Sequence, residues 1–159
     1  MSNSAIAAER CLRAGRRPAV LDIDLHHGNG TQAVYYARQD VLTVSIHADP
    51  SRFYPFFWGH AGERGVGAGH GYNLNLPLPL GTGDDGFLAA LAEAGERIRL
   101  FGADILITPR GSTRSRVTPS AEAEGDDRGA SPRSPPVVPP SNATWCSSRR
   151  AAISARSSP

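Results

Sequence analysis

The stretch PAVLDIDLHHGNGTQ, residues 18–32, joins an apolar run to a cluster of carboxylates, imidazoles and glycines. A short apolar run that ends in such polar residues predicts a buried strand over Pro18–Asp24. The next apolar run, VLTVSIH, predicts a second buried strand over Val41–His47, and Thr31–Arg38 between the two predicts a short helix. This order of strand, helix and strand indicates a parallel sheet.

The flanking sequence continues the alternation of strands and helices. Its apolar patterns and capping residues predict a helix over Ser4–Arg16, an extended segment over Tyr72–Leu78, a helix over Asp84–Phe101 and a buried strand over Ala103–Thr108. We therefore expect an α/β fold with a parallel sheet that is covered on both faces. Ligands bind such sheets at the carboxyl ends of the strands, and Asp22–His27 lies at such an end.

The composition changes abruptly after Thr108. The segment 109–159 is dominated by Pro, Ser, Arg and Ala and has almost no periodic apolar pattern, so it cannot bury enough surface to offset the entropy cost of ordering. We expect one partial domain over residues 1–108 and a disordered tail over 109–159. The tail also holds the excess of positive charge: the formal charge is −2 before Pro109 (9 Arg, 11 Asp and Glu) and +4 from it onward (8 Arg, 4 Asp and Glu).

The charge and cysteine content exclude several classes of function. Because the basic excess is confined to the tail, the predicted domain has no basic face that would indicate nucleic-acid binding. Cys11 and Cys146 form no CxxC pair, so neither a disulfide framework nor a zinc ribbon is indicated. The sequence contains no signal-peptide pattern and no membrane-length apolar run, so we expect a cytoplasmic protein without a membrane partner.

The polar cluster at the end of the first strand is a candidate metal site. If the strand continues through this segment, Asp22, Asp24 and His26 project to the same side. A carboxylate with an imidazole suits Zn²⁺ or Fe²⁺, and a catalytic zinc takes about three protein ligands. The alternative is that these are hydrogen-bonded turn residues without a metal. The other histidines, taken singly, favour structural or surface roles: His47, His60 and His70.

Two further motifs have competing interpretations. GVGAGHGYN (Gly65–Asn73) does not fit the phosphate-binding pattern GxGxxG and precedes an extended segment instead of a helix, so nucleotide binding is not indicated. FYPFFW (Phe53–Trp58) has the composition of a base-stacking platform, but no basic stripe surrounds it. We therefore interpret these aromatic residues as core or as the lining of a binding tunnel.

Several motifs together resemble the histone deacetylase superfamily, in its bacterial branch near the acetylpolyamine amidohydrolases. VLDIDLHHGNGTQ is followed by VLTVSIHADP and then by FYPFFWGHAGERGVGAGHGYNLNLPLPLGTGDDGFLAAL, in order and at matching distances. SNSAIAA resembles the helix before the first motif. The resemblance covers Ser2 to about Thr108 and implies a fragment of the three-layer, parallel-sheet fold of arginases and deacetylases. It also implies zinc-dependent hydrolysis of acetyl-amine amides, with acetylpolyamine or acetyl-lysine as substrate.

The resemblance also implies roles for individual residues. Asp24 and His26 match two of three zinc ligands, and Asp22 matches a carboxylate that orients a catalytic histidine located elsewhere. Asn29 matches a similar supporting position, and Tyr54 matches an aromatic residue that lines the acyl-amine tunnel. The glycines of GVGAGHG match a loop near the tunnel rim. A structural K⁺ site is matched, partly through backbone carbonyls, by Asp22, Asp24, His26, Ser45 and Ile46.

The family's reaction needs groups that this sequence does not contain. A tandem histidine pair supplies the general base, a third zinc ligand follows the ILIT strand, and a Gly-Gly-Tyr tyrosine stabilises the oxyanion. The tandem pair would lie upstream of Met1, so we expect a chain truncated at its N-terminus.

A frameshift after about Thr108 would explain the missing third ligand. With one permitted codon set, Ser112–Ser120 read from the third base of its first codon gives Asp-Ala-Phe-Glu-Gly-Asp-Pro-Phe, which resembles the segment that carries this ligand. The alternative interpretation of segment 109–159 is a functional basic, proline-rich tail.

We therefore expect a deacetylase fragment that is inactive as written. The alternatives are a non-catalytic remnant that binds a metal or an acylated amine, and an arginase-like hydrolase, which would need further Asp-rich motifs that the sequence lacks.

Overall fold

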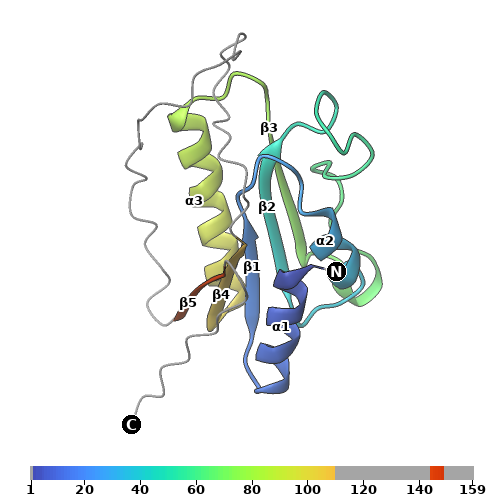
Figure 1. Cartoon of the computed structure of the whole chain (residues 1–159), viewed down its shortest axis with the longest axis vertical. Helices are drawn as coiled ribbons and strands as arrows, with labels where there is room; N and C mark the ends of the chain where they lie inside the picture. Colours follow the sequence, from blue (N-terminus) through green and yellow to red (C-terminus); the bar gives the residue numbers. More distant parts are fainter. Residues whose placement is uncertain (1, 110–143, 149–159) are drawn as a thin grey trace.

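Five parallel strands form one sheet, whose spatial order is β3-β2-β1-β4-β5. The computed structural model describes residues 2–109 and 144–148, and Figure 1 shows the sheet between two layers of helices. The strands are β1 (Pro18–Asp22), β2 (Leu42–Ala48), β3 (Asn73–Leu78), β4 (Ile105–Pro109) and β5 (Thr144–Ser148).

Helices cover both faces of this sheet. α1 (Asn3–Arg13) and α2 (Asn29–Tyr35) lie on one face, and α3 (Asp84–Phe101) lies on the other (Figure 1). A short 3₁₀ helix, η1 (Gly67–Gly69), lies in the connection between β2 and β3. None of the helices in the described part of the chain is long and apolar enough to span a membrane. The predicted α/β fold with a parallel sheet is confirmed.

The two faces of the sheet bury separate apolar clusters. Because successive side chains of a strand point to opposite faces, an uninterrupted apolar run such as Ala19–Leu21 serves both clusters. The buried cluster under α3 includes Ala19, Leu21, Leu42, Val44, Ile46, Leu74, Ala94 and Ile98. The cluster under α1 and α2 includes Ala8, Cys11, Val20, Tyr35, Ile105 and Ile107. Burying each large aliphatic side chain contributes about 1.5–3 kcal/mol, so these clusters fix the strand ends that carry the candidate site.

Most predicted elements are found, several with shifted ends. α3 spans Asp84–Phe101 as predicted and ends at Gly102, whose left-handed backbone (φ 71°) favours glycine. α1 begins at Asn3, after Ser2, whose Oγ accepts a hydrogen bond from Ala5 N (3.5 Å).

β1 is shorter than predicted, since it ends at Asp22 instead of Asp24. The Asp22 carboxylate accepts a hydrogen bond from Asp24 N (3.0 Å), and the Asp24 carboxylate accepts one from His26 N (3.0 Å). Such bonds from a side chain to the backbone two residues on compete with the sheet and turn the chain. The prediction that Asp22, Asp24 and His26 project to the same side of a continuing strand is therefore wrong, because β1 ends at Asp22 and the chain turns at Asp24 and His26.

The structure differs from the predicted disordered tail at two places. Pro109 is the last residue of β4, and Thr144–Ser148 form β5, which pairs with β4 along its whole length. Without β5 the apolar strand β4 would be an edge with unpaired backbone groups, which readily accepts another strand. Thr and Trp favour strands. The prediction of disorder for 110–143 and 149–159 lies outside the described residues.

Candidate functional site

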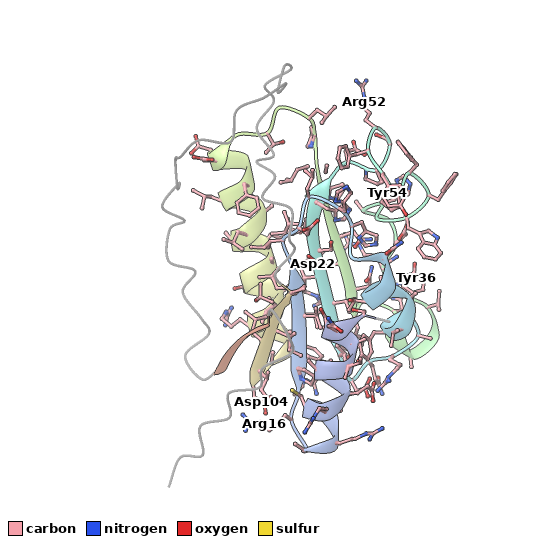
Figure 2. All side chains as sticks on the ribbon, viewed as in Figure 1. Arg16, Asp22, Tyr36, Arg52, Tyr54 and Asp104 are labelled. Atoms are coloured by element: carbon pink, nitrogen blue, oxygen red, sulfur yellow. The ribbon has the colours of Figure 1, made fainter. Side chains whose placement is uncertain are left out.

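The polar side chains after β1 gather at the carboxyl end of the sheet. Asp22 is the last residue of β1 and pairs in register with Ser45 of β2. Figure 2 shows Asp22 near the middle of the molecule, with Tyr54 above it and Arg16 and Asp104 near the lower end. Ligand sites of parallel sheets lie at the carboxyl edge. The cluster therefore occupies the position that the sequence indicated.

The turn brings Asp24 and His26 together. His26 Nδ1 lies 3.3 Å from Asp24 Oδ1. Two ligand atoms at about 2.0–2.1 Å from a tetrahedral zinc ion are themselves about 3.3–3.4 Å apart. The two atoms therefore have the spacing of one edge of a zinc tetrahedron, and a carboxylate and an imidazole are both ligands that zinc accepts. The residues present fit two of the positions that a zinc ion needs.

This pair is open to solvent on one side. The His26 side chain is 40% exposed and that of Asp24 is 17% exposed. Phe53 and Tyr54 flank the His26 ring, with ring centroids at 5.2 and 6.1 Å. Within residues 2–109 and 144–148, no three His, Cys, Asp or Glu side chains come together to hold a metal. A cation can reach the pair from outside, but this part of the chain supplies an incomplete ligand set.

Asp22 is more buried than a surface carboxylate. Burial raises its pKa to about 6; the hydrogen bond from Asp24 N opposes the rise and the Asp24 charge adds to it. No basic side chain of the described residues forms an ion pair with Asp22. Gly28 lies against it, and a Cβ at that position would be 2.6 Å from Asp22 Oδ2, so a larger residue there would require the Asp22 carboxylate to move. Among the described residues, no neighbouring basic side chain thus balances the charge of the Asp22 carboxylate.

The other predicted site residues lie around this pair. Asn29 opens α2, and its N–H donates to His27 O (2.8 Å). Ile46 points its side chain into the core under α3, which leaves only its backbone to contact a cation. Tyr54 is 62% exposed and lies beside His26.

The glycine-rich loop Gly65–Gly71 packs against the end of α2. Val66 N donates to Tyr36 O (2.9 Å), and a Cβ at Gly69 would lie 2.4 Å from the same oxygen. Glycine is needed here because two backbone segments approach each other closely. These contacts give the loop a packing role, and its place near a tunnel rim stays a prediction.

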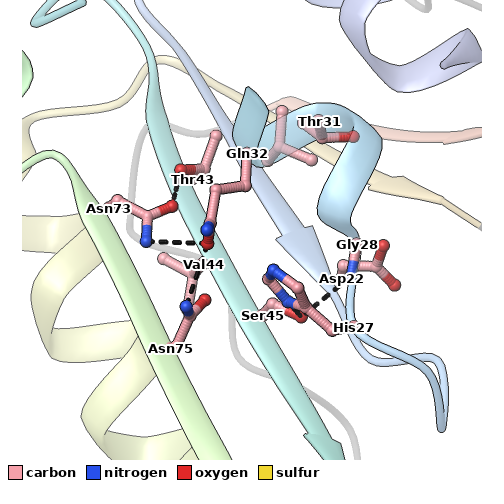
Figure 3. A pocket seen from close by; sticks show the side chains of 11 residues that line it. Asp22, His27, Gly28, Thr31, Gln32, Thr43, Val44, Ser45, Asn73 and Asn75 are labelled. Atoms are coloured by element: carbon pink, nitrogen blue, oxygen red, sulfur yellow. Dashed lines mark hydrogen bonds between the residues drawn. The ribbon is translucent and has the colours of Figure 1, made fainter. Parts of the chain in front are cut away.

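A buried hydrogen-bonded network follows His26 in the chain. His27 Nδ1 lies 3.4 Å from Ser45 Oγ, which lies 2.9 Å from His47 Nδ1 (Figure 3 shows His27 and Ser45). His47 Nε2 donates to Gly59 O (2.9 Å). Burial lowers the pKa of His27 to about 4, with the nearby His47 adding to the effect, and burial also lowers the pKa of His47. Both rings are therefore neutral at neutral pH, and His47 has the structural role that its sequence context favoured.

Glu63 links the backbone after the exposed aromatic residues Phe56–Trp58 to α2 through hydrogen bonds. Its carboxylate accepts hydrogen bonds from Gly59 N (3.1 Å) and His60 N (3.2 Å), and also from the side-chain amide of Gln32. Hydrogen bonds from a backbone to an ionised carboxylate are stronger than neutral ones. Glu63 therefore fixes the chain that leaves the exposed aromatic residues Phe56–Trp58.

Sequence reasoning missed Gln32, Glu63 and the two asparagines of β3. Gln32 Oε1 accepts hydrogen bonds from Asn73 Nδ2 (3.0 Å) and Asn75 Nδ2 (2.9 Å). A signal was present, because NLN alternation puts both asparagines on one face of a buried strand, where polar groups need partners. Their partner lies 41 and 43 residues away along the chain, so spacing alone could not identify it.

Known proteins resemble this chain in sequence. The family profile named "Histone deacetylase domain" matches residues 1–129. Acetylpolyamine amidohydrolase 1 of Pseudomonas aeruginosa is 47% identical over 123 residues, which cover 77% of this chain and 36% of that protein. The acetylpolyamine amidohydrolase of Mycoplana ramosa is 43% identical over 112 residues, which cover 70% of this chain and 33% of that protein.

Solved structures resemble the chain as well. The crystal structure of acetylpolyamine aminohydrolase from Burkholderia pseudomallei matches with a TM-score of 0.67 and 49% identity, over 69% of this chain and 32% of that one. An HDAC homolog from Aquifex aeolicus matches with a TM-score of 0.65 and 35% identity, over 69% of this chain and 30% of that one. The chain thus spans about a third of the length of these relatives. Since the family profile matches most of its residues, the chain belongs to the histone deacetylase family.

Proposed function

We propose that this chain is part of a cytoplasmic, zinc-dependent amidohydrolase that removes acetyl groups from acetylated amines. The observation that carries the proposal is the Asp24–His26 pair, whose facing atoms are 3.3 Å apart at the carboxyl end of the sheet. Relatives named acetylpolyamine amidohydrolases, at 47% and 43% identity, support the substrate class. Acetylpolyamines and acetyl-lysine both present a secondary amide on a narrow alkyl chain, so both belong to the proposal.

Asp24 and His26 would hold the zinc ion. When bound, zinc polarises an acyl carbonyl and makes water a better nucleophile. Asp22 would accept a hydrogen bond from a histidine other than the five in this sequence and would so orient that ring. Phe53 and Tyr54 keep the His26 ring in place and offer an apolar wall to the alkyl chain of a substrate.

A structural K⁺ ion is the second ion of the proposal. Ser45 and Ile46 on β2 would hold it together with Asp22 and the backbone of the turn, and Asn29 would support the same edge. The proposal is supported by the register of Asp22 with Ser45 and by the absence of a basic partner for Asp22 in the described residues.

A polypeptide limited to these 159 residues is expected to bind zinc weakly and to hydrolyse no amide. Its one adjacent histidine pair, His26–His27, consists of a proposed ligand and a buried network residue. It contains no Gly-Gly-Tyr segment. The second candidate is a non-catalytic remnant that binds a metal or an acylated amine, and the exposed aromatic side chains beside His26 favour it.

Zinc titration of the purified chain tests the ligand assignment. We expect one zinc ion per chain by calorimetry, with at least tenfold weaker binding in His26→Ala and Asp24→Asn, because each removes one of two ligands. His70→Ala is the matched control, since His70 is exposed and lies outside the pair. Equal zinc affinity in the wild type and in both ligand variants would exclude Asp24 and His26 as the metal site.

Hydrolysis assays test the activity separately. The zinc-loaded chain is incubated with acetylputrescine and with a fluorogenic acetyl-lysine peptide, and we expect no turnover above buffer. Turnover that His26→Ala abolishes would contradict the inactivity while supporting the amidohydrolase chemistry. Binding of acetylputrescine without turnover would favour the non-catalytic remnant.

A further inference from the structure

Three buried side chains from α2 and β3 meet at Gln32. The glutamine lies on α2, and Asn73 and Asn75 lie on β3, at one edge of the sheet. Gln32 Oε1 accepts hydrogen bonds from Asn73 Nδ2 (3.0 Å) and Asn75 Nδ2 (2.9 Å), which Figure 3 marks with dashed lines. Because buried polar groups need partners, these contacts join the helix to the strand.

The two asparagines also bind backbone carbonyls, and this fixes the direction of each hydrogen bond. Asn73 Nδ2 donates to the carbonyl oxygen of Glu63 (2.7 Å), and Asn75 Nδ2 donates to that of His60 (3.3 Å). Carbonyl oxygens only accept, so both positions hold amide nitrogens. Nitrogens that also point at the Gln32 amide require its oxygen to face them, so Gln32 has one orientation.

The nitrogen of the Gln32 amide therefore faces the Glu63 carboxylate. Gln32 Nε2 donates to Glu63 Oε2. The same carboxylate accepts the backbone N–H groups of Gly59 (3.1 Å) and His60 (3.2 Å). Segment 59–63 is thus held through its N–H groups by Glu63 and through its carbonyls by β3, and the Gln32–Glu63 contact connects the two sets of bonds.

The aromatic loop, Phe53–Trp58, ends directly before this segment and gains little from its own burial. Its last three side chains, Phe56–Trp58, are between 49% and 85% exposed. Phe56 has a left-handed backbone (φ 62°), which a bulky residue rarely adopts unless its surroundings impose it. The conformation of the loop therefore depends on the segment that anchors its end.

We propose that Gln32 is a positioning residue, which sets the place of an aromatic wall beside His26 through its hydrogen bond with Glu63. The wall consists of Phe53 and Tyr54, whose ring centroids lie 5.2 and 6.1 Å from that of His26. Gln32 acts on a substrate only through the loop. This role rests on the proposed function, because a wall beside His26 matters only when an acylated amine binds there.

Exchange of the two side chains tests the contact. In Gln32→Glu, two carboxylates face each other. In Glu63→Gln, either two NH₂ groups face each other or the backbone N–H groups lose their acceptor. The double variant Gln32→Glu/Glu63→Gln restores one donor and one acceptor, because the amide at position 63 donates to the carboxylate at position 32. Gly59 N keeps the other oxygen of position 63, at 3.2 Å.

Fluorine nuclear magnetic resonance of the full-length chain, labelled with 5-fluorotryptophan, reports the loop because Trp58 directly precedes Gly59. The sequence contains two tryptophans, and Trp145→Phe assigns the lines. We expect the Trp58 line to shift or broaden in each single variant and to return to the wild-type position in the double variant. Nuclear Overhauser contacts between the rings of Tyr54 and His26 are expected to weaken and to return in parallel.

The matched control is Gln39→Glu/Glu93→Gln, which makes the same two changes at exposed positions and should leave the Trp58 line in place. A double variant at positions 32 and 63 that is as disturbed as the single variants would overturn the proposal, as would single variants with a wild-type Trp58 line. Ring contacts that persist while the Trp58 line moves would overturn the positioning role. The measurement uses neither zinc nor substrate, so it can succeed or fail independently of the zinc titration and hydrolysis assays of the proposed function.

Discussion

Asp24 positions His26 before any metal arrives. The Asp24 carboxylate accepts the backbone N–H of His26 (3.0 Å), and the same oxygen lies 3.3 Å from the ring nitrogen. The side chains of the two proposed ligands are therefore held close together by a local turn and not by the sheet. Such preorganisation lowers the entropy cost of closing a metal site.

Glu63 makes a pH-dependent contribution to stability. Burial alone would raise its pKa, but hydrogen bonds from Gln32, Gly59 and His60 outweigh burial, and the pKa is lowered from the ordinary 4.5. A carboxyl group with a lowered pKa stabilises the fold above the unfolded-state pKa and loses that contribution as pH falls through the folded-state pKa. We expect Glu63→Gln to lose roughly 1–3 kcal/mol at neutral pH, measured by urea unfolding.

The loss should shrink as pH falls from 4.5 through the lower pKa of folded Glu63, because the unfolded chain takes up the proton first. Glu93→Gln is the matched control, because Glu93 is exposed on α3 and its removal should change the free energy of unfolding by less than about 0.5 kcal/mol. An equal effect of Glu63→Gln at acidic and neutral pH would show that the charge of Glu63 does not stabilise the fold.

Helices and strands could be predicted because their patterns are local. Runs of Val, Leu and Ile mark β1, β2 and β4, and the α3 sequence carries both its acidic start and its glycine end. The end of β1 could not be predicted from apolar pattern, because the Asp22 side chain competes with the sheet for the backbone of Asp24. The polar network could not be predicted from the sequence, because the Gln32 side chain bonds to Asn73 and Asn75 only once β2 and β3 have paired.

Gly95 is expected to destabilise α3. This residue lies in the middle of the helix on its exposed side, and a Cβ there would meet no atom within 4 Å. We expect Gly95→Ala to raise the free energy of unfolding by about 0.5–1 kcal/mol, because alanine loses less backbone entropy in a helix. This increase is measured as a shift of the urea-unfolding midpoint to higher urea concentration.

Gly86→Ala in the same helix is the comparison variant. There a Cβ would lie 2.5 Å from Thr82 Cγ2, so part of the gain is expected to be lost when that side chain moves. A gain at Gly86 that equals or exceeds the gain at Gly95 would contradict this ranking.

One edge of the sheet is formed by β5, which lies far from its neighbour β4 in the sequence. β5 pairs with β4 from Ile105 to Pro109, although 34 residues outside the described part separate the two strands. Both faces of β4 are buried, so its exposure as an edge would leave an apolar strand with unpaired backbone groups. Stability is therefore expected to depend on residues beyond the predicted domain boundary at Thr108.

Truncation measures the contribution of β5. We expect a chain that ends at Pro109 to self-associate and to unfold at a lower temperature than the full chain, because the β4 edge is free to pair with a second copy. A chain that ends at Ser148 keeps β5 and is the control. Sedimentation velocity at several concentrations gives the oligomeric state, and a monomeric Pro109 chain of unchanged stability would contradict the role of β5.

The most direct test of the proposed metal site is a crystal structure of the zinc-treated chain, with anomalous data collected on both sides of the zinc edge. We predict one anomalous peak within coordination distance of His26 Nδ1 and the Asp24 carboxylate, at about 2.0–2.2 Å from each. A zinc peak elsewhere on the chain, or no peak at this pair when zinc is present in excess, would contradict the assignment of Asp24 and His26 as the zinc ligands of this deacetylase-family chain.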